Sequence, residues 1–234
     1  MGDQSASTKS PRRKQQPIAA RTGKPLVQTR AEQTRAAILT VARQNFAEHG
    51  FADASIRDIA GEAGTTHSMV TYHFGTKEEL WRESVREMFA AFRVEVTDDM
   101  DRDMEAGLPL RDQYVRMVQR YARYSARHPE HARITIMETI RGGERLEWMV
   151  GNFVLDAHRA ALPFLQLLMD EGVIARMPVI SFLYNLVAML QMPFVLAKEA
   201  EIAVRYDALS DEAIERQAEA VLTLTLLPQA KGSD

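Results

Sequence analysis

The chain has 234 residues, enough to bury a substantial core as one large domain or as a small head joined to a larger body. It contains no cysteine, which excludes disulfides, cysteine nucleophiles and thiolate metal sites and fits a reducing cytoplasm. The formal net charge is −3, but residues 1–30 alone carry +6, from seven Lys or Arg against one Asp, which leaves −9 for the remainder.

The basic segment 1–30 is rich in Ser, Gln, Pro, Lys and Arg and lacks the apolar run of a secretory signal. We predict that it is a disordered arm. Because Lys and Arg gain free energy by displacing counterions from phosphates, a basic arm on an acidic body is typical of a protein that binds a polyanion at one end. A solvated tail, or a remnant of an expression vector, explains the same composition equally well.

The first predicted helix covers residues 32–48. Its apolar residues recur at helical spacing and form one buried stripe: Ile38, Val41, Ala42 and Phe46. Gly50 is expected to end this helix in a left-handed conformation.

Two short helices joined by a glycine turn come next. Ser55 is predicted to cap the first, with Asp58 in the capping-box position. Gly64 permits a tight turn, and Thr66 is predicted to cap the second helix, at about His67 to His73. This is the pattern of a helix-turn-helix.

The remaining chain is predicted to be helical. Thr76 and Glu79 form a full capping box, so a long helix is expected to begin at Lys77. The predicted helices cover residues 77–104, 110–127, 130–141, 146–171, 178–200 and 211–226, and no strand pattern or internal repeat is visible. We therefore predict an all-α fold: a basic arm at 1–30, a three-helix head at 31–76, a larger helical-bundle body at 77–228 and a short tail at 229–234.

The most apolar stretch, residues 179–197, approaches the roughly 20 residues that a membrane-spanning helix requires. Asn185, Gln191 and Pro193 interrupt it, which favours a helix buried in the body or between two subunits. We expect no membrane partner.

Residues 34–80 resemble the DNA-binding head of the TetR family of transcription regulators. The matching motifs are N-F-A-E-H-G-F at the end of the first helix, S-I-R-D-I-A-G-E-A-G across the second, and Y-H-F-G-T-K-E-E-L, which closes the third and opens the fourth. The resemblance covers roughly a fifth of the chain strongly. It implies a homodimer that binds double-stranded operator DNA through its heads and a small-molecule effector through its bodies.

In a helix-turn-helix the second helix enters the major groove while the first crosses the DNA backbone. Val70 and Phe74 are needed inward, so we expect four outward side chains to contact bases or phosphates: His67, Ser68, Thr71 and Tyr72. The resemblance places Tyr72, Lys77 and Ser55 at phosphates and the first residues of the recognition helix, from Thr66 on, at bases.

A helix N-terminus followed by a lysine is also a natural phosphate site, which supports Thr76 and Lys77, although simple capping explains Thr76 and Glu79 equally well. For His73 the stronger interpretation is packing against Tyr72 rather than base reading. The chain departs from the common family pattern at Thr65, Met69, Val70 and Thr71, so no operator sequence can be transferred to it.

For the body, the resemblance implies an effector pocket. Pro163 and Pro193 are expected to kink their helices, and the candidate pocket residues near them are Met117, Tyr121, Met137, Trp148, His158, Tyr184, Asn185 and Met189. Ordinary core packing is the alternative for each of them singly.

The last two predicted helices match the positions where the family forms its dimer. Four apolar residues give the last helix a wide surface that a monomer would cover poorly: Val221, Leu222, Leu224 and Leu226. The sequence therefore predicts a homodimer, whose two-fold axis would place two recognition helices on a palindrome.

No phosphate-binding loop, nucleophile elbow or zinc-protease motif is present, and His128 and His131 lack the partners of a metal site. We therefore expect no enzyme, no cofactor and no metal. The predicted function is that of a cytoplasmic DNA-binding transcription regulator, a repressor released by a ligand. The alternative is a helical protein-interaction module that binds no DNA.

Overall fold

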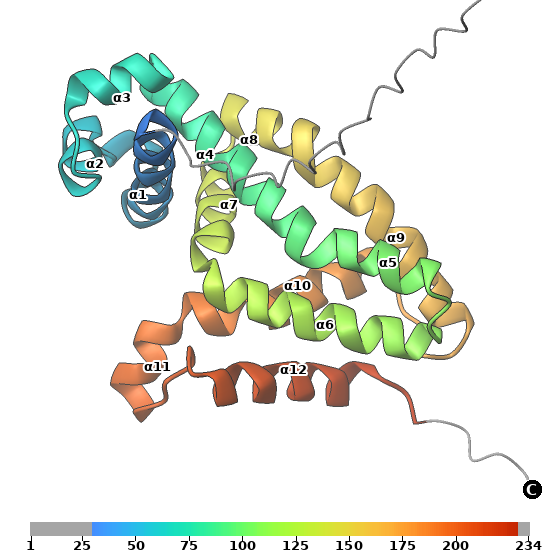
Figure 1. The fold of residues 1–234 in the computed structure, drawn as a ribbon. Coiled ribbons are helices and arrows are strands. Elements are labelled where there is room, and N and C mark those ends of the chain that lie inside the picture. The colour runs from blue at the N-terminus through green and yellow to red at the C-terminus, as the bar shows by residue number, and fades with distance from the viewer. Residues whose placement is uncertain (1–29, 229–234) are drawn as a thin grey trace, which may run out of the picture.

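The structure is a computed structural model and describes residues 30–228, which form helices joined by short loops (Figure 1). Within this range the only strand-like feature is an isolated bridge between Ile174 and Leu226. The prediction of an all-α fold is confirmed. The predicted basic arm lies outside the described residues apart from Arg30, as does the predicted tail after residue 228.

The head consists of α1 (Arg30–Asp53), α2 (Ile56–Glu62) and α3 (His67–Phe74), with the first turns of α4 (Lys77–Phe92) packed against them. Figure 1 shows α2 and α3 at one end of the molecule, far from α12. The predicted glycine turn is present, because Gly64 has a φ of +64° between α2 and α3.

The body contains the remaining helices, two of which are short π-helical segments: η1 (Arg93–Thr97), α5 (Asp98–Glu105), α6 (Leu110–Arg127), α7 (Pro129–Arg141), α8 (Glu144–Met149), η2 (Val150–Val154), α9 (Leu155–Asp170), α10 (Val179–Val195), α11 (Ala197–Val204) and α12 (Asp211–Thr225).

Three of the predicted long helices are interrupted. The helix predicted at 77–104 contains η1, and the one predicted at 146–171 begins at Glu144 and contains η2. The helix predicted at 178–200 ends at Val195 and bends by 60° into α11. Each π-helical segment is only five residues long, which is too short for the apolar periodicity of a long helix to reveal it.

The Pro193 region shows how a proline is accommodated inside a helix. Proline has no N–H, so the carbonyl of Met189, four residues earlier, loses its donor within α10. The side-chain amide of Gln217 in α12 donates to that carbonyl at 2.9 Å. The bond replaces the missing helical bond and joins α10 to α12.

The buried apolar side chains form two clusters, and α4 contributes to both. The body cluster joins α6, α9, α10 and α12. The head cluster takes in Ile134 of α7 and Met149 of α8, so the body supplies part of the head's core. Consequently α7 and α8 hold the orientation of the head.

Gly50 lies where the head meets α7. Its φ of +71° breaks the helical path of α1 near the predicted end of the helix. A Cβ atom on Gly50 would lie 2.7 Å from both Met137 Cε and Arg141 Nη2 of α7. Glycine is favoured here because of its positive φ, and the ends of the Met137 and Arg141 side chains pack close to its Cα.

Candidate nucleic-acid interface

The third helix is anchored on one side and open on the other. Val70 and Phe74 are buried in the head cluster, and the Thr66 hydroxyl caps α3 by accepting a hydrogen bond from the Met69 N–H at 3.3 Å. The opposite side of α3 is open to solvent. A short helix held by its inner face and by its cap presents its outer side chains in a fixed geometry.

The sequence-predicted base and phosphate residues gather on this outer side. Thr66, His67, Ser68, Thr71 and Tyr72 are all exposed, and Tyr72 is the most prominent, with an exposed fraction of 79%. Met69 is exposed at 36%, so it also faces outward.

Three of the hydroxyls are already engaged in local bonds. Thr71 Oγ1 donates to the carbonyl of His67 at 3.1 Å, and the hydroxyls of Thr66 and Ser68 share a bond of 2.9 Å. Within residues 30–228, neither the imidazole of His67 nor the hydroxyl of Tyr72 has a hydrogen-bond partner. The latter two groups have their full hydrogen-bonding capacity available for DNA.

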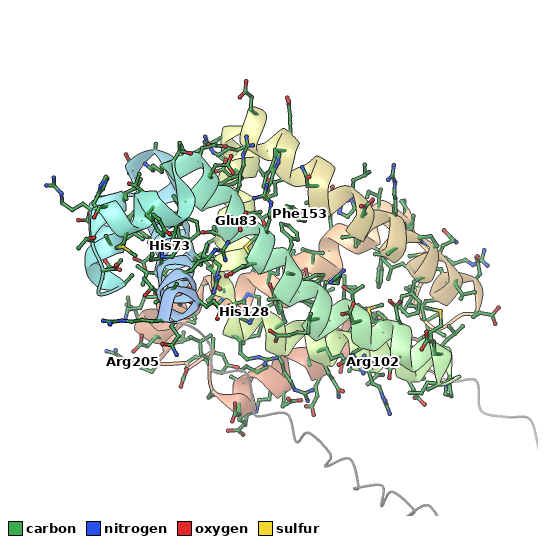
Figure 2. All side chains as sticks on the ribbon, turned by 45° about the horizontal axis from the view of Figure 1, so that its top comes forward. His73, Glu83, Arg102, His128, Phe153 and Arg205 are labelled. Atoms are coloured by element: carbon green, nitrogen blue, oxygen red, sulfur yellow. The ribbon has the colours of Figure 1, made fainter. Side chains whose placement is uncertain are left out.

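His73 lies on the flank of the recognition helix rather than on its outer face (Figure 2). Its half-buried ring meets Tyr72 edge-on, with 5.3 Å between the ring centroids. Its Nε2 is buried and has no hydrogen-bond partner among the described residues. This position favours bracing of Tyr72, as the sequence suggested.

Ser55 and Thr76 occupy the two other helix starts of the head. The Ser55 hydroxyl accepts from the Asp58 N–H at 3.3 Å, and the Thr76 hydroxyl accepts from the Glu79 N–H at 3.1 Å. The full capping box predicted at α4 is only half formed. The Thr76 N–H donates to the carbonyl of Phe74, while the Glu79 carboxylate lies 3.7 Å from Arg82.

Lys77, the first residue of α4, is held against the corner between α1 and α2. Its Nζ donates to the carbonyl of Ala52 at 3.0 Å and lies 4.9 Å from the centroid of the Phe51 ring. The pKa of Lys77 is lowered, mainly because burial desolvates the ammonium group. Asp53 opposes this effect, and Arg145 adds to it. An ammonium group has three N–H donors, so two remain for a phosphate.

Sequence reasoning missed Arg57. It is exposed on α2, two residues after Ser55, and has no ion-pair partner within the described part of the chain. Two other head arginines are paired: Arg35 Nη2 lies 2.5 Å from the Glu83 carboxylate, and Arg43 Nη1 lies 2.7 Å from that of Glu87. The signal available in the sequence was an arginine at the start of a helix that crosses the DNA backbone in this motif.

The sequence-predicted pocket residues lie in several parts of the structure. Met117 and Tyr121 belong to the body core, where Tyr121 accepts a hydrogen bond from the amide of Gln191 at 2.9 Å. Trp148 packs against the head cluster, with 5.6 Å between the centroids of its ring and that of Trp81. Met137 lies beside Gly50.

The other four predicted pocket residues lie on α9 and α10. The rings of His158 and Tyr184 meet edge-on at 5.9 Å. Tyr184 and Asn185 are exposed, whereas Met189 is half-buried. Met189 packs against the body cluster that contains Met117 and Tyr121, so the eight residues fall into separate groups, and none of them lines either of the two cavities at the junction of head and body.

Two cavities lie at the junction of head and body. One, of about 500 Å³, is lined by Glu78, Arg82, Gly142, Gly143, Glu144 and Arg145. The other, of about 230 Å³, is lined by Arg43, Glu87, Met88, Ala90, Ala91, His128 and Glu130.

The two histidines of the H-P-E-H segment have internal partners. His128 Nε2 lies 3.1 Å from Glu95, and its Nδ1 lies 3.4 Å from Glu130. The bond to Glu130 raises the pKa of His128 against an opposing effect of desolvation. No group of three or more potential metal ligands is found among residues 30–228.

Within the same residues, no single helix has the length and hydropathy to cross a bilayer. The bent pair α10 and α11 meets those criteria only when its two helices are counted together.

Comparison with known proteins finds sequence similarity over the head. Residues 38–83 match the family described as bacterial regulatory proteins, tetR family. The HTH-type transcriptional repressor Rv3405c of Mycobacterium tuberculosis is 50% identical over 52 residues, which cover 22% of this chain and 28% of that protein. The match thus spans little more than a quarter of the curated relative.

The fold similarity extends over the body. A crystal structure of a HlyIIR mutant protein superposes with a TM-score of 0.63 at 19% identity, over 83% of this chain and 98% of the other. The transcriptional regulator FadR from Bacillus subtilis, in complex with stearoyl-CoA, superposes with a TM-score of 0.59 at 16% identity, over 81% and 96%. Residues 38–83 of the head thus match the tetR family model, and the described helices share the fold of these solved structures.

Proposed function

We propose that the protein is a sequence-specific repressor that binds double-stranded operator DNA as a homodimer and is released by a small-molecule effector. The observation that carries the proposal is the outer side of α3, where five polar side chains are exposed on a helix fixed by Val70 and Phe74. A regulator is favoured over an enzyme because the exposed groups suit groove recognition.

The side chains divide into two roles. His67, Ser68 and Thr71, on the first turns of the recognition helix, would read base edges in the major groove. Tyr72, Lys77 and Arg57 would contact phosphates, with Ser55, Thr66 and Thr76 at the helix starts beside them. His73 would support Tyr72 through the edge-on ring contact.

The charge distribution assigns a role to the N-terminal arm. Residues 31–76 hold three Arg and five Asp or Glu, so the head by itself has a net charge of −2. Attraction to DNA must then come from a few unpaired cations and from residues 1–30, which carry +6. We infer that the arm supplies much of the sequence-independent affinity.

The dimer is proposed to form through the outer side of α10. This helix contains no Asp, Glu, Lys or Arg over its whole length, yet Ile180 and Tyr184 are exposed at 42% and 59%. An exposed helical face without charge is typical of the centre of a subunit interface. In the last helix, by contrast, Val221 is buried and Leu222 and Leu226 are half-buried in their own subunit. The exposed apolar surface of this helix is therefore smaller than the sequence predicted.

Leu224 is the exception in α12, with an exposed fraction of 75%. The N–H of Leu227 donates to the carbonyl of Val173 at 2.9 Å, which holds the end of α12 beside the segment that leads into α10. Leu224 would therefore extend the α10 face, and two copies of α10 and α12 would form the interface.

The effector is proposed to act on the junction of head and body. A ligand releases DNA only if it binds the two head orientations with different affinity. The head core contains residues of α7 and α8, so a shift of these helices moves the recognition helices apart or together. The solved FadR complex contains stearoyl-CoA.

Footprinting of the purified full-length protein on DNA that flanks its own gene tests the proposal. We expect protection of a palindrome, followed by loss of protection when a screened metabolite binds. A repressor of this kind would act in the cytoplasm, where bacterial DNA lies. Absence of protection at every flanking palindrome would favour the helical interaction module instead.

A further inference from the structure

Arg145, at the start of α8, reaches from the body into the head. Its Nε lies 3.0 Å from the carboxylate of Glu138, which has an exposed fraction of 2%. Its guanidinium carbon lies 4.0 Å from the centroid of the Phe51 ring and 5.8 Å from that of Trp81. A buried carboxylate and two aromatic rings thus fix the guanidinium from both sides of the junction.

Phe51 is shared by two cations from different parts of the chain. Arg145 contacts it from the body, and Lys77 of the proposed phosphate contact lies 4.9 Å from the same ring. The ring is also stacked on Phe46 at 6.1 Å and meets Trp81 edge-on at 6.5 Å. The carbonyl that accepts from Lys77 belongs to Ala52, the residue after Phe51.

We propose that Arg145 is a positioning residue for DNA binding: by holding Phe51 and the α1–α2 corner, it sets where the Lys77 ammonium meets a DNA phosphate. The inference rests on the proposed function. Through Arg145, the corner between α7 and α8 would connect the body directly to one phosphate contact.

The neighbouring contacts support this route. Gly50, just before Phe51, packs against Arg141 and Met137 of α7. The body therefore contacts the α1–α2 corner at two adjacent residues, Gly50 and Phe51. Arg145 is also a cause of the lowered pKa of Lys77. A displacement of α7 and α8 would therefore move the ring, the carbonyl and the ammonium together.

The test is a double-mutant cycle between Arg145→Gln and Lys77→Gln, read on a duplex that the wild-type protein selects from a random-sequence library. Each phosphate contact contributes about 0.9 to the slope of log K against log salt. We expect R145Q to weaken binding roughly five- to tenfold and to lower the slope by about one, as K77Q does. In the K77Q background, R145Q should weaken binding by no more than about twofold and leave the salt slope nearly unchanged. The two substitutions would act on the same phosphate contact, so their effects should not add.

Two further variants separate positioning from other effects. The guanidinium carbon of Arg86 lies 5.2 Å from the centroid of the Trp148 ring, another aromatic ring at the junction. The R86Q variant removes this cation and should leave the salt slope unchanged. R145K keeps the charge, but its compact ammonium cannot stack flat on Phe51 and bond Glu138 together, so it should not restore wild-type binding. If R145Q fails to fold because Glu138 is left unpaired, the pair E138Q/R145Q removes that charge and takes its place in the cycle.

A folded R145Q protein with an unchanged slope, or equal losses from R145Q in the wild-type and K77Q backgrounds, would overturn the role of Arg145. If the wild-type protein selects no duplex, the proposed function fails instead, so the two failures are distinguishable.

Discussion

The hydroxyl of Tyr124 lies 2.7 Å from Nδ1 of His131 inside the core that joins α4, α6 and α7. The same hydroxyl donates its one hydrogen to the carbonyl of Met88 at 3.1 Å. It can therefore only accept from His131, so Nδ1 must carry a hydrogen. Burial lowers the pKa of His131 to about 4, which keeps the ring neutral near pH 7.

This pair predicts a loss of stability in acid. The unfolded chain takes up a proton on His131 below about pH 6.5, whereas the folded chain does so only near pH 4. The contribution of neutral His131 is thus complete above pH 6.5 and decreases as the pH falls toward 4, by about 3 kcal/mol in total. Urea unfolding of wild type and His131→Gln at several pH values measures it.

The glutamine variant should lose less stability than the wild-type protein between pH 6.5 and 4. His128 titrates with the opposite sign: its pKa is raised, so its contribution is present below pH 6.5 and is lost as the pH rises through the folded pKa. His128→Gln is therefore the control that retains the acid loss. Equal pH dependence in wild type and H131Q would contradict the assignment.

Arg57 is predicted to contact a phosphate. Arg57→Gln should weaken binding to all duplexes to a similar extent and lower the salt slope by about one. His67→Ala and Ser68→Ala should instead change the preferred sequence. Fluorescence anisotropy on a selected duplex and on a scrambled duplex, over a range of salt concentrations, separates the two effects. A change of sequence preference in R57Q would assign Arg57 to base reading.

The uncharged face of α10 is predicted to hold the dimer together. Tyr184→Arg should convert a dimer into a monomer of 26.4 kDa, because a buried guanidinium without a partner is costly. Ile140→Arg is the matched control, since Ile140 is exposed at 78% on α7. Light scattering coupled to size-exclusion chromatography gives both masses. A dimeric Y184R protein would place the interface elsewhere.

Removal of residues 1–28 is predicted to lower affinity for every DNA sequence without changing operator choice. The deleted segment carries six of the Lys and Arg residues and one Asp. Each released counterion contributes to the salt dependence, so the truncated protein should show a smaller slope. Unchanged affinity at physiological salt would show that the arm is a passive tail.

Local signals were sufficient to predict the head from sequence. The caps at Ser55, Thr66 and Thr76 and the turn at Gly64 depend on residues a few positions apart, so the sequence displays them directly. The ends of α6 also agree with the prediction at Leu110 and Arg127.

Contacts between distant segments were not predictable in the same way. The sharing of Phe51 by Lys77 and Arg145 joins three separate parts of the chain, and no spacing rule connects them. The predicted pocket residues were chosen for their chemistry near two prolines, but the fold distributes them between the two cores and an outer face. The π-helical segments are absent from the prediction because each is only five residues long within an otherwise helical run.

Selection of duplexes from a random-sequence library by the full-length protein, with the stoichiometry of the selected complex, tests the central claim most directly. We predict one palindromic family of sequences bound by two chains, with half-site centres about one helical turn or a multiple apart, and loss of that preference in a His67→Ala/Ser68→Ala variant. No enrichment of any sequence, or equal enrichment by the variant, would contradict recognition through α3.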